Sequence, residues 1–134
     1  MVHEPILWGL MHSKFPGAVW VVQCKPIRGW RGSVDVAIFG PCRKLVVQVD
    51  GSSHSRMRRH LRVTLTGQLA IDKRFNTKAH KQGVGVLRLH VDDGQQWLPL
   101  LRSAMDACMG AAPGLPWPFY AASRSIMCEP PSRV

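Results

Sequence analysis

Residues 44–54 read KLVVQVDGSSH, and this stretch changes character halfway along. Its first half is a short apolar run rich in β-branched residues, which is typical of a strand buried on both faces. Its second half adds an amide, a carboxylate and an imidazole at Gln48, Asp50 and His54. A buried polar group costs roughly 2 kcal/mol or more unless it finds a partner. We therefore expect this strand to deliver polar groups to a site at its end.

The hydrophobic pattern on either side of this strand predicts a mixed α/β domain. Two strand-like runs precede it, separated by turns that contain Gly and Pro, and three strands in succession indicate a meander. After it, Ile71, Phe75 and Ala79 recur at helical spacing, and Gly83 is typical of a helix C-cap. The expected elements are a helix at 3–15, strands at 18–27, 33–39 and 45–50, a helix at 69–83, a strand at 84–91, a turn at 92–97 and a helix at 97–109.

Domain organisation follows from length and composition. A chain of 134 residues, 46% of them hydrophobic, is long enough for one domain whose core needs no disulfides. We expect that domain to span residues 1–109. From residue 110 onward the sequence is rich in Pro and Gly and has no period, so residues 110–134 are expected to form a tail. Three aromatic residues of the tail are able to pack back onto the domain: Trp117, Phe119 and Tyr120.

Charge is the outlying property of the composition. Eighteen Lys and Arg face eight Asp and Glu, a formal net charge of +10. This balance indicates a polyanionic partner, nucleic acid before an anionic membrane, and no apolar run approaches the ~18 residues of a membrane span. The expected nucleic-acid-binding residues are a run of arginines and the cations of the helix that follows: Arg56, Arg58, Arg59, Arg62, Lys73, Arg74, Lys78 and Lys81.

The cysteines and the N-terminus bear on the compartment. The four cysteines are far apart and form no CxxC or CxxH pair, so we expect free thiols rather than a zinc site. Free thiols indicate a reducing, intracellular environment. Glu4 precedes any Lys or Arg, which is unlike a signal or transit peptide.

Three polar residues on neighbouring strands suggest a metal site. Asp35 lies in one expected strand, and Gln48 and Asp50 lie in the strand that follows it. Oxygen ligands on adjacent strands suit a hard cation such as Mg²⁺, or Mn²⁺. Such a cation polarises a phosphodiester and lowers the pKa of an attacking water. Asp35, Gln48 and Asp50 are therefore the candidate metal ligands.

Three further residues could complete a hydrolytic centre. His54 is a base that titrates near neutral pH. Asp72 brings a third carboxylate from the following helix, and Glu4 a fourth from the first helix. Together with the nearby cations, which would hold a phosphate backbone, these groups indicate cleavage of phosphodiester bonds. The candidate catalytic residues are Glu4, Asp35, His54 and Asp72.

The order of these motifs resembles a known nuclease family. Five segments match over roughly residues 3–90: HEPILWGL, VQCKPI, VDVAIF, LVVQVDGSSH and DKRFNTKAHKQGVGVLRL. They are similar to the very-short-patch-repair-like branch of the PD-(D/E)XK nucleases, which includes the EDxHD homing endonucleases. The resemblance implies a restriction-endonuclease-like fold, a mixed central sheet flanked by helices. It also implies a magnesium-dependent DNA endonuclease of the repair or homing type.

The resemblance implies a role for each candidate residue. Asp35 would be the principal metal ligand, joined by a backbone carbonyl near Gln48. His54 would act on the nucleophilic water, and Asp72 would orient the His54 imidazole. Glu4 would hold the metal's water ligands from the helix side. A chain of this size that cuts both strands is expected to act as a homodimer.

The chain also departs from the family pattern. Gln48 stands where many relatives have Glu, which removes a charge and is expected to weaken metal binding, although the repair-type members also lack a carboxylate there. Phe75 and Ala79 replace the Arg and Leu of the pattern. These departures leave open a degenerate nuclease that only binds.

Two other functions fit the same sequence. The RAP domain, an RNA-binding module, resembles the chain in its "EVDG-x-x-H" motif, its basic helix and its Trp after the last strand, here Trp97. The N-terminal HEPILWGL favours the nuclease branch over it. A structural basic protein within a ribonucleoprotein assembly is the third possibility. DNA is thus expected as the partner ahead of RNA.

Each singled-out residue also has a structural explanation. Asp50 stands before a glycine, which is common turn chemistry. A carboxylate at Glu4 or Asp72 in a first helical turn would stabilise its helix by about 0.3–1 kcal/mol. His54 could be an ordinary loop histidine. Trp30 could stack on a base or pack on its own sheet.

Overall fold

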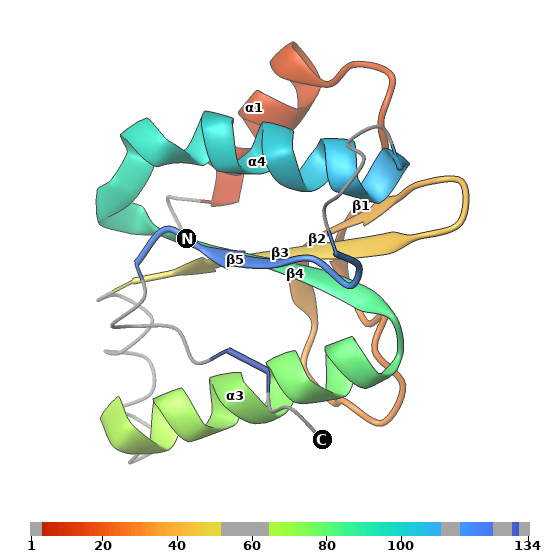
Figure 1. The fold of residues 1–134 in the computed structure, drawn as a ribbon. Coiled ribbons are helices and arrows are strands. Elements are labelled where there is room, and N and C mark those ends of the chain that lie inside the picture. Colours follow the sequence, from red (N-terminus) through yellow and green to blue (C-terminus); the bar gives the residue numbers. More distant parts are fainter. Residues whose placement is uncertain (1–3, 52–64, 111–115, 125–129, 132–134) are drawn as a thin grey trace.

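The computed structural model describes residues 4–51, 65–110, 116–124 and 130–131. Within them, five strands form one mixed sheet that is flanked by helices, so the expected α/β architecture is confirmed (Figure 1). The elements are, in chain order, α1 (Glu4–Lys14), β1 (Val19–Cys24), β2 (Val34–Phe39), β3 (Lys44–Asp50), α3 (Leu65–Lys81), β4 (Val84–His90), the 3₁₀ turn η1 (Val91–Asp93), α4 (Gly94–Met109) and β5 (Tyr120–Ala122).

The strands lie in the order β1-β2-β3-β4-β5. The first three are antiparallel neighbours, which confirms the expected meander. β4 runs parallel to β3, and the helix α3 supplies the crossover that a parallel pair requires. As a result, the carboxyl ends of β3 and β4 meet the amino end of β2 at one end of the sheet.

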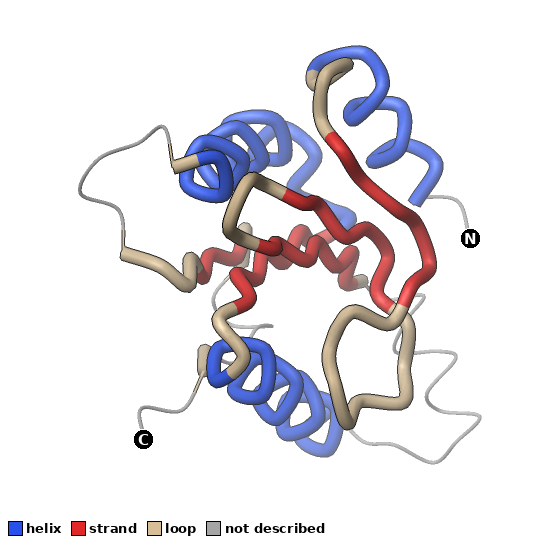
Figure 2. The backbone as a smooth tube through the Cα atoms, turned by 90° about the vertical axis from the view of Figure 1, so that its right-hand side faces the viewer, coloured by secondary structure: helices blue, strands red, loops and turns tan. Residues whose placement is uncertain are grey.

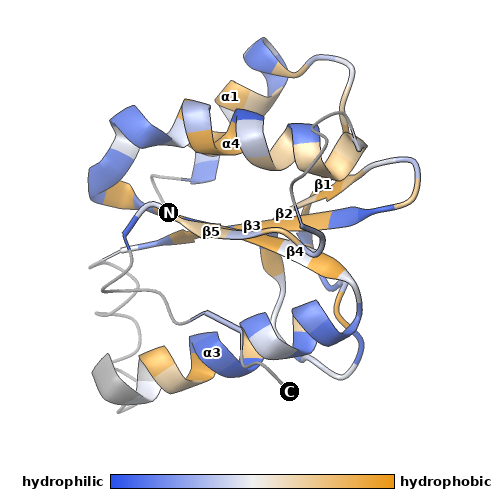
Figure 3. Cartoon of the chain, viewed as in Figure 1, coloured by the Kyte–Doolittle hydropathy of each residue, from blue (hydrophilic) through white to orange (hydrophobic). Residues whose placement is uncertain are grey.

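The helices form a layer on each face of the sheet. α1 and α4 lie over one face and α3 over the other (Figure 1). The most hydrophobic colours of Figure 3 follow the strands between these layers. None of the helices in the described ranges combines the length and the apolar character that crossing a bilayer would demand.

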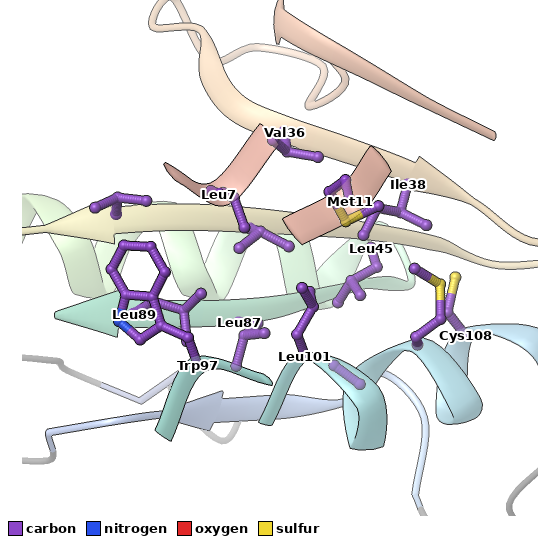
Figure 4. Close-up of a cluster of buried hydrophobic side chains, with 14 residues drawn as sticks. Leu7, Met11, Val36, Ile38, Leu45, Leu87, Leu89, Trp97, Leu101 and Cys108 are labelled. Atoms are coloured by element: carbon purple, nitrogen blue, oxygen red, sulfur yellow. The ribbon is translucent and has the colours of Figure 1, made fainter. Parts of the chain in front are cut away.

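The larger part of the core lies between the sheet and the α1–α4 layer. Alternate residues of β3 point to this side, Leu45, Val47 and Val49. They pack with Leu7 of α1 and Leu101 of α4 (Figure 4). Burying one such side chain contributes about 1.5–3 kcal/mol.

A second, smaller core lies under α3. Val46 of β3 points to this side, together with Ala37 of β2 and Val86 of β4. Phe75 and Ala79 of α3 cover them. β3 is therefore apolar on both faces along most of its length, as its run of β-branched residues predicts.

The turn before the last helix is shorter than the sequence pattern predicts. The His90 Nδ1 accepts a hydrogen bond from the Asp92 backbone N–H (3.1 Å), which closes η1. The Trp97 Nε1–H donates to the His90 carbonyl (2.8 Å) and fixes the first turn of α4. The helix consequently begins at Gly94, and the expected turn at 92–97 was wrong over its second half.

The C-terminal part contributes a strand that the sequence does not predict. Tyr120–Ala122 pair with β4 in parallel, and the Val86 N–H donates to the Phe119 carbonyl (2.7 Å). The Trp117 Nε1–H donates to the Gly83 carbonyl (2.8 Å), so the aromatic residues do pack back. The sequence does not predict this strand for two reasons. Three residues are too few to show a hydrophobic period, and their pairing partner lies more than 30 positions away in the chain.

Replacing Gly85 by Ala tests the packing of this C-terminal segment. A Cβ at Gly85 would lie 2.7 Å from the Trp117 ring and 3.1 Å from the Phe119 carbonyl oxygen. We expect Gly85→Ala to lower the free energy of unfolding by about 1–3 kcal/mol, measured by urea denaturation. Gly94→Ala is the matched control: nothing lies within 4 Å of its Cβ, so it should be neutral or slightly stabilising. Equal stability of the two variants would contradict the packing described.

Candidate functional site

The α3 side of the sheet turns from apolar to polar along the strands. The residues that follow Ala37, Val46 and Val86 on this face, toward the common end of β2, β3 and β4, are Asp35, Gln48, Asp50 and Arg88. They lie together because β2 runs antiparallel to β3 while β4 runs parallel to it. A pocket of about 110 Å³ opens here, lined by these four residues and by Trp30, Gly32, Ser33, Val49, Ile71, Asp72 and Phe75.

Two hydrogen bonds between β2 and β3 hold Asp35 and Gln48 in place. The Asp35 backbone N–H donates to Gln48 Oε1 (3.0 Å), and the Val49 N–H donates to Asp35 Oδ2 (2.7 Å). These side chains continue the β2–β3 pairing one step beyond Val36 and Val47, the last paired backbone positions at this end. The side-chain oxygen of Gln48 therefore accepts a hydrogen bond that positions Asp35. None of the described residues donates to the second carboxylate oxygen of Asp35, Oδ1.

The Asp35 carboxyl holds its proton unusually well. The pKa of Asp35 is raised to about 6, mainly by burial, and the hydrogen bond from the Val49 N–H opposes this rise. The nearby carboxylates of Glu4 and Asp50 raise the pKa further, and the Arg88 guanidinium lowers it. The pocket thus contains a partly buried carboxyl in acidic surroundings, the environment in which a functional carboxyl often lies.

Arg88 is a buried cation that ties the sheet to α3. Its side chain is only 3% exposed. Its Nη1 donates to both carboxylate oxygens of Asp50 (3.1 and 3.2 Å) and lies 3.7 Å from Asp72 Oδ1. Its Nε donates to Asn76 Oδ1 (3.0 Å), and the guanidinium lies 5.5 Å from the centre of the Phe75 ring. Asp50 and Asp72 therefore share a cation supplied by the protein itself.

The structure brings together most of the candidate carboxylates. Asp35, Gln48, Asp50 and Asp72 line one pocket. Glu4, at the start of α1, is 6% exposed and close enough to influence Asp35 electrostatically. Across the described ranges, no three His, Cys, Asp or Glu side chains converge as a ready-made metal site. Asp50, a candidate metal ligand, contacts Arg88 instead.

Several candidate residues lie outside the described residues. They are the proposed base and the arginine run: His54, Arg56, Arg58, Arg59 and Arg62. Their roles stay predictions.

Two residues of the site were not predicted from the sequence. Arg88 interrupts an otherwise apolar strand, VGVLRLH, and its register position opposite Gln48 places it at the site. Asn76 follows Asp72 by four positions, so the two share one face of α3. Both signals are visible in the sequence, but they acquire meaning only once β4 is known to pair with β3 in parallel.

The basic residues of α3 occupy two flanks of the helix. Successive residues turn by about 100°, so Lys73 and Lys78 lie about 140° apart around the axis. Arg74 and Lys81, at four positions before and three after Lys78, neighbour it. All four side chains are exposed. The predicted group of cations is therefore divided, with Lys73 away from the other three.

Replacing Asp35 by Asn should change the pH dependence of stability. Folding raises this pKa from 3.8 to about 6, so the folded state binds the proton more tightly and stability falls as the pH rises from about 4 to about 6. Each unit of difference between the folded and unfolded pKa changes the free energy of unfolding by about 1.4 kcal/mol. We expect Asp35→Asn, which keeps an acceptor for the Val49 N–H, to match the native protein near pH 4 and to exceed it by about 1–3 kcal/mol above pH 7. Urea denaturation at several pH values measures this, and a difference independent of pH would contradict it.

Replacing Arg88 by Met should destabilise the folded protein, because two buried carboxylates lose a nearby positive charge. Arg88→Met leaves Asp50 and Asp72 without their shared cation and should lower the free energy of unfolding by about 3–5 kcal/mol at pH 7. The loss should shrink when Asp50→Asn is added, because one buried charge then disappears. A double variant as unstable as the single one would show that packing, and not charge, dominates at this position.

A scan of family models and searches of curated proteins and of solved structures find no match to this chain.

Proposed function

We propose that this protein is a metal-dependent endonuclease that hydrolyses DNA phosphodiester bonds, of the repair or homing type within the PD-(D/E)XK superfamily. The observation that carries the proposal is the Asp35 carboxyl, with its pKa near 6, in one pocket with Gln48, Asp50 and Asp72. These residues come from three separate sequence motifs.

The architecture supports the finer fold assignment. A helix, an antiparallel meander, a second helix and a parallel strand follow in the order that the matching motifs require. The sheet is mixed and flanked by helices on both faces, with its acidic groups at the strand ends. The proposal is therefore a PD-(D/E)XK fold of the very-short-patch-repair-like branch.

The donor set of the pocket suits a magnesium ion with few protein ligands. Asp35 Oδ1 in the pocket is one candidate oxygen donor, with a backbone carbonyl near Gln48; the Glu4 carboxylate, which does not line the pocket but influences Asp35 electrostatically, is the other. Mg²⁺ typically takes one or two carboxylates and completes its shell with water and substrate phosphate, so a cluster of three carboxylates is not required. Burial is the main cause of the raised pKa of Asp35, and the negative charges of Glu4 and Asp50 add to it; a bound cation would relieve this repulsion. When bound, the ion supplies Lewis-acid polarisation of the phosphodiester and a more acidic water.

The chain's own residues would then carry the proton transfer and the positioning. His54 accepts the proton of the attacking water as the new oxygen–phosphorus bond forms, and the bond from phosphorus to the leaving sugar oxygen breaks. Gln48 holds Asp35 in place through the backbone bond described above. Arg88 fixes Asp50 and neutralises part of the acidic pocket, which lowers the repulsion that a phosphate would meet.

A specific observation favours the second candidate, a catalytically inactive RNA-binding domain of the RAP-like kind. The Gln48 carbonyl is engaged by the Asp35 N–H, and both Asp50 oxygens are engaged by Arg88. Such a pocket offers fewer oxygen ligands than its residue content suggests. The net charge of +10 serves either function.

Cleavage assays separate the two functions. Supercoiled plasmid and labelled RNA are incubated with the protein and Mg²⁺ or Mn²⁺, beside Asp35→Asn and His54→Ala. We expect metal-dependent cutting of DNA that Asp35→Asn reduces to background and His54→Ala slows by about 10²–10⁴-fold. Asp106→Asn, an exposed carboxylate on the opposite helical layer, is the matched control and should cut normally.

Metal binding has a readout that is independent of cleavage. Mg²⁺ should raise the melting temperature of the native protein and of Asp106→Asn but not that of Asp35→Asn, since a ligand stabilises only the form that binds it. Salt-sensitive RNA binding that survives both active-site substitutions, without cutting, would overturn the nuclease and support the inactive RNA-binding domain.

A further inference from the structure

The loop between β1 and β2 lies beside α3 and carries its own cations. Residues 25–33 form a wide loop next to this helix (Figure 2). Lys25, Arg28 and Arg31 are exposed on it, and Trp30 is half-buried. The matching sequence segments include only residues 25–27 of this loop, and no nucleic-acid contact is predicted from the sequence for its three cations.

The loop is fixed to the helix. The Arg28 backbone N–H donates to Gln82 Oε1 (3.0 Å), and Gln82 Nε2 donates back to the Arg28 carbonyl (2.8 Å). Ile27 is buried in the smaller core. Trp30 meets Phe75 edge to face, with ring centres 5.3 Å apart. The loop therefore presents its cations from a defined backbone rather than from a free segment.

The loop and the helix place their positive charges close together. A Cβ at Gly29 would lie 2.9 Å from Lys78 Nζ, so the lysine amine rests against the loop backbone. Gly29 has a φ of +76°, which also favours glycine here. Lys78 thus lies on the flank of α3 that faces the loop, with Arg74 and Lys81 adjoining it.

The pocket opens between these two walls. The loop contributes Trp30, Gly32 and Ser33 to its lining, and α3 contributes Ile71 and Phe75 on the loop side of the helix. Arg31 lies between two lining residues of the loop, and Lys78 follows Ile71 by seven positions, two turns along the same flank. Residues that carry a positive charge on both walls therefore lie near residues that line the acidic pocket.

We propose that these walls form a groove that binds the sugar–phosphate backbone of a DNA strand. We call it the basic groove, and its cations are Arg28, Arg31, Arg74 and Lys78. The inference rests on the proposed nuclease function, because it assigns the path by which the scissile phosphodiester reaches the pocket. The charge supports it: an acidic pocket alone repels a phosphate, whereas a rim of cations attracts the polyanion and releases its counterions.

The test measures binding without catalysis. A fluorescently labelled DNA duplex is titrated with the full chain in EDTA at several salt concentrations. Arg31→Gln and Lys78→Gln should each lower the slope of log affinity against log salt by about one phosphate contact, about 0.9 in magnitude. Extrapolated from 1 M to 0.1 M salt, such a loss corresponds to about an eightfold weaker affinity.

Matched controls exclude a general effect of charge. Lys14→Gln removes the same charge from α1, and Arg102→Gln removes it from α4, both on the opposite face of the sheet. Both variants should bind about as well as the native chain. Gln82→Ala removes no charge but releases the loop, and it should weaken binding while the melting temperature shows that the fold is retained. Equal weakening by Lys14→Gln and Lys78→Gln would overturn the basic groove, as would equally tight binding of a polyglutamate peptide.

The groove and the nuclease fail in different ways. If the groove variants weaken binding but no metal-dependent cleavage occurs, the basic groove stands and the nuclease falls. If cleavage occurs and Arg31→Gln and Lys78→Gln cut and bind as the native chain does, the nuclease stands and the groove falls.

Discussion

The polar half of this molecule depends on one buried guanidinium. Arg88 stands in a strand whose seven residues are all buried, and a charge in that position is tolerated only with partners. Asp50 from β3 and Asp72 and Asn76 from α3 supply them. Two kinds of contact therefore hold α3 against the sheet. Phe75 and Ala79 pack in the smaller apolar core, and Asp72 and Asn76 contact the Arg88 guanidinium.

This arrangement separates the carboxylates of the pocket into two classes. Asp50 and Asp72 lie beside Arg88, whereas the hydrogen bond to the Asp35 carboxylate comes from the backbone, and burial and the nearby charges of Glu4 and Asp50 oppose its ionisation. Stability alone would favour an uncharged residue at Asp35. A residue that lowers stability where it stands is expected at functional sites, because the cost is offset when a ligand arrives. The basic groove proposed beside the pocket supplies the complementary attraction for an anionic substrate.

Local patterns predicted much of the fold. The β-branched run at residues 45–49 gave a doubly buried strand, and the spacing of Ile71, Phe75 and Ala79 gave α3, although the helix begins four residues before the expected position 69. Pairing partners were not available from such patterns. The parallel register that sets Arg88 beside Gln48, and the short β5, are properties of contacts distant in sequence. The same holds for the division of α3 into a loop-facing and an opposite flank, which needs the position of the β1–β2 loop.

The short strand β5 makes β4 an interior strand of the sheet instead of an edge strand. Without it, the strand that carries Arg88 would be the edge of the sheet, with a row of unpaired backbone donors and acceptors. With it, β4 is an interior strand whose residues Val86–Arg88 are paired on both sides. The C-terminal strand β5 therefore covers part of an edge that β4 would otherwise expose. As a result, the buried charge of Arg88 lies one strand in from the edge of the sheet.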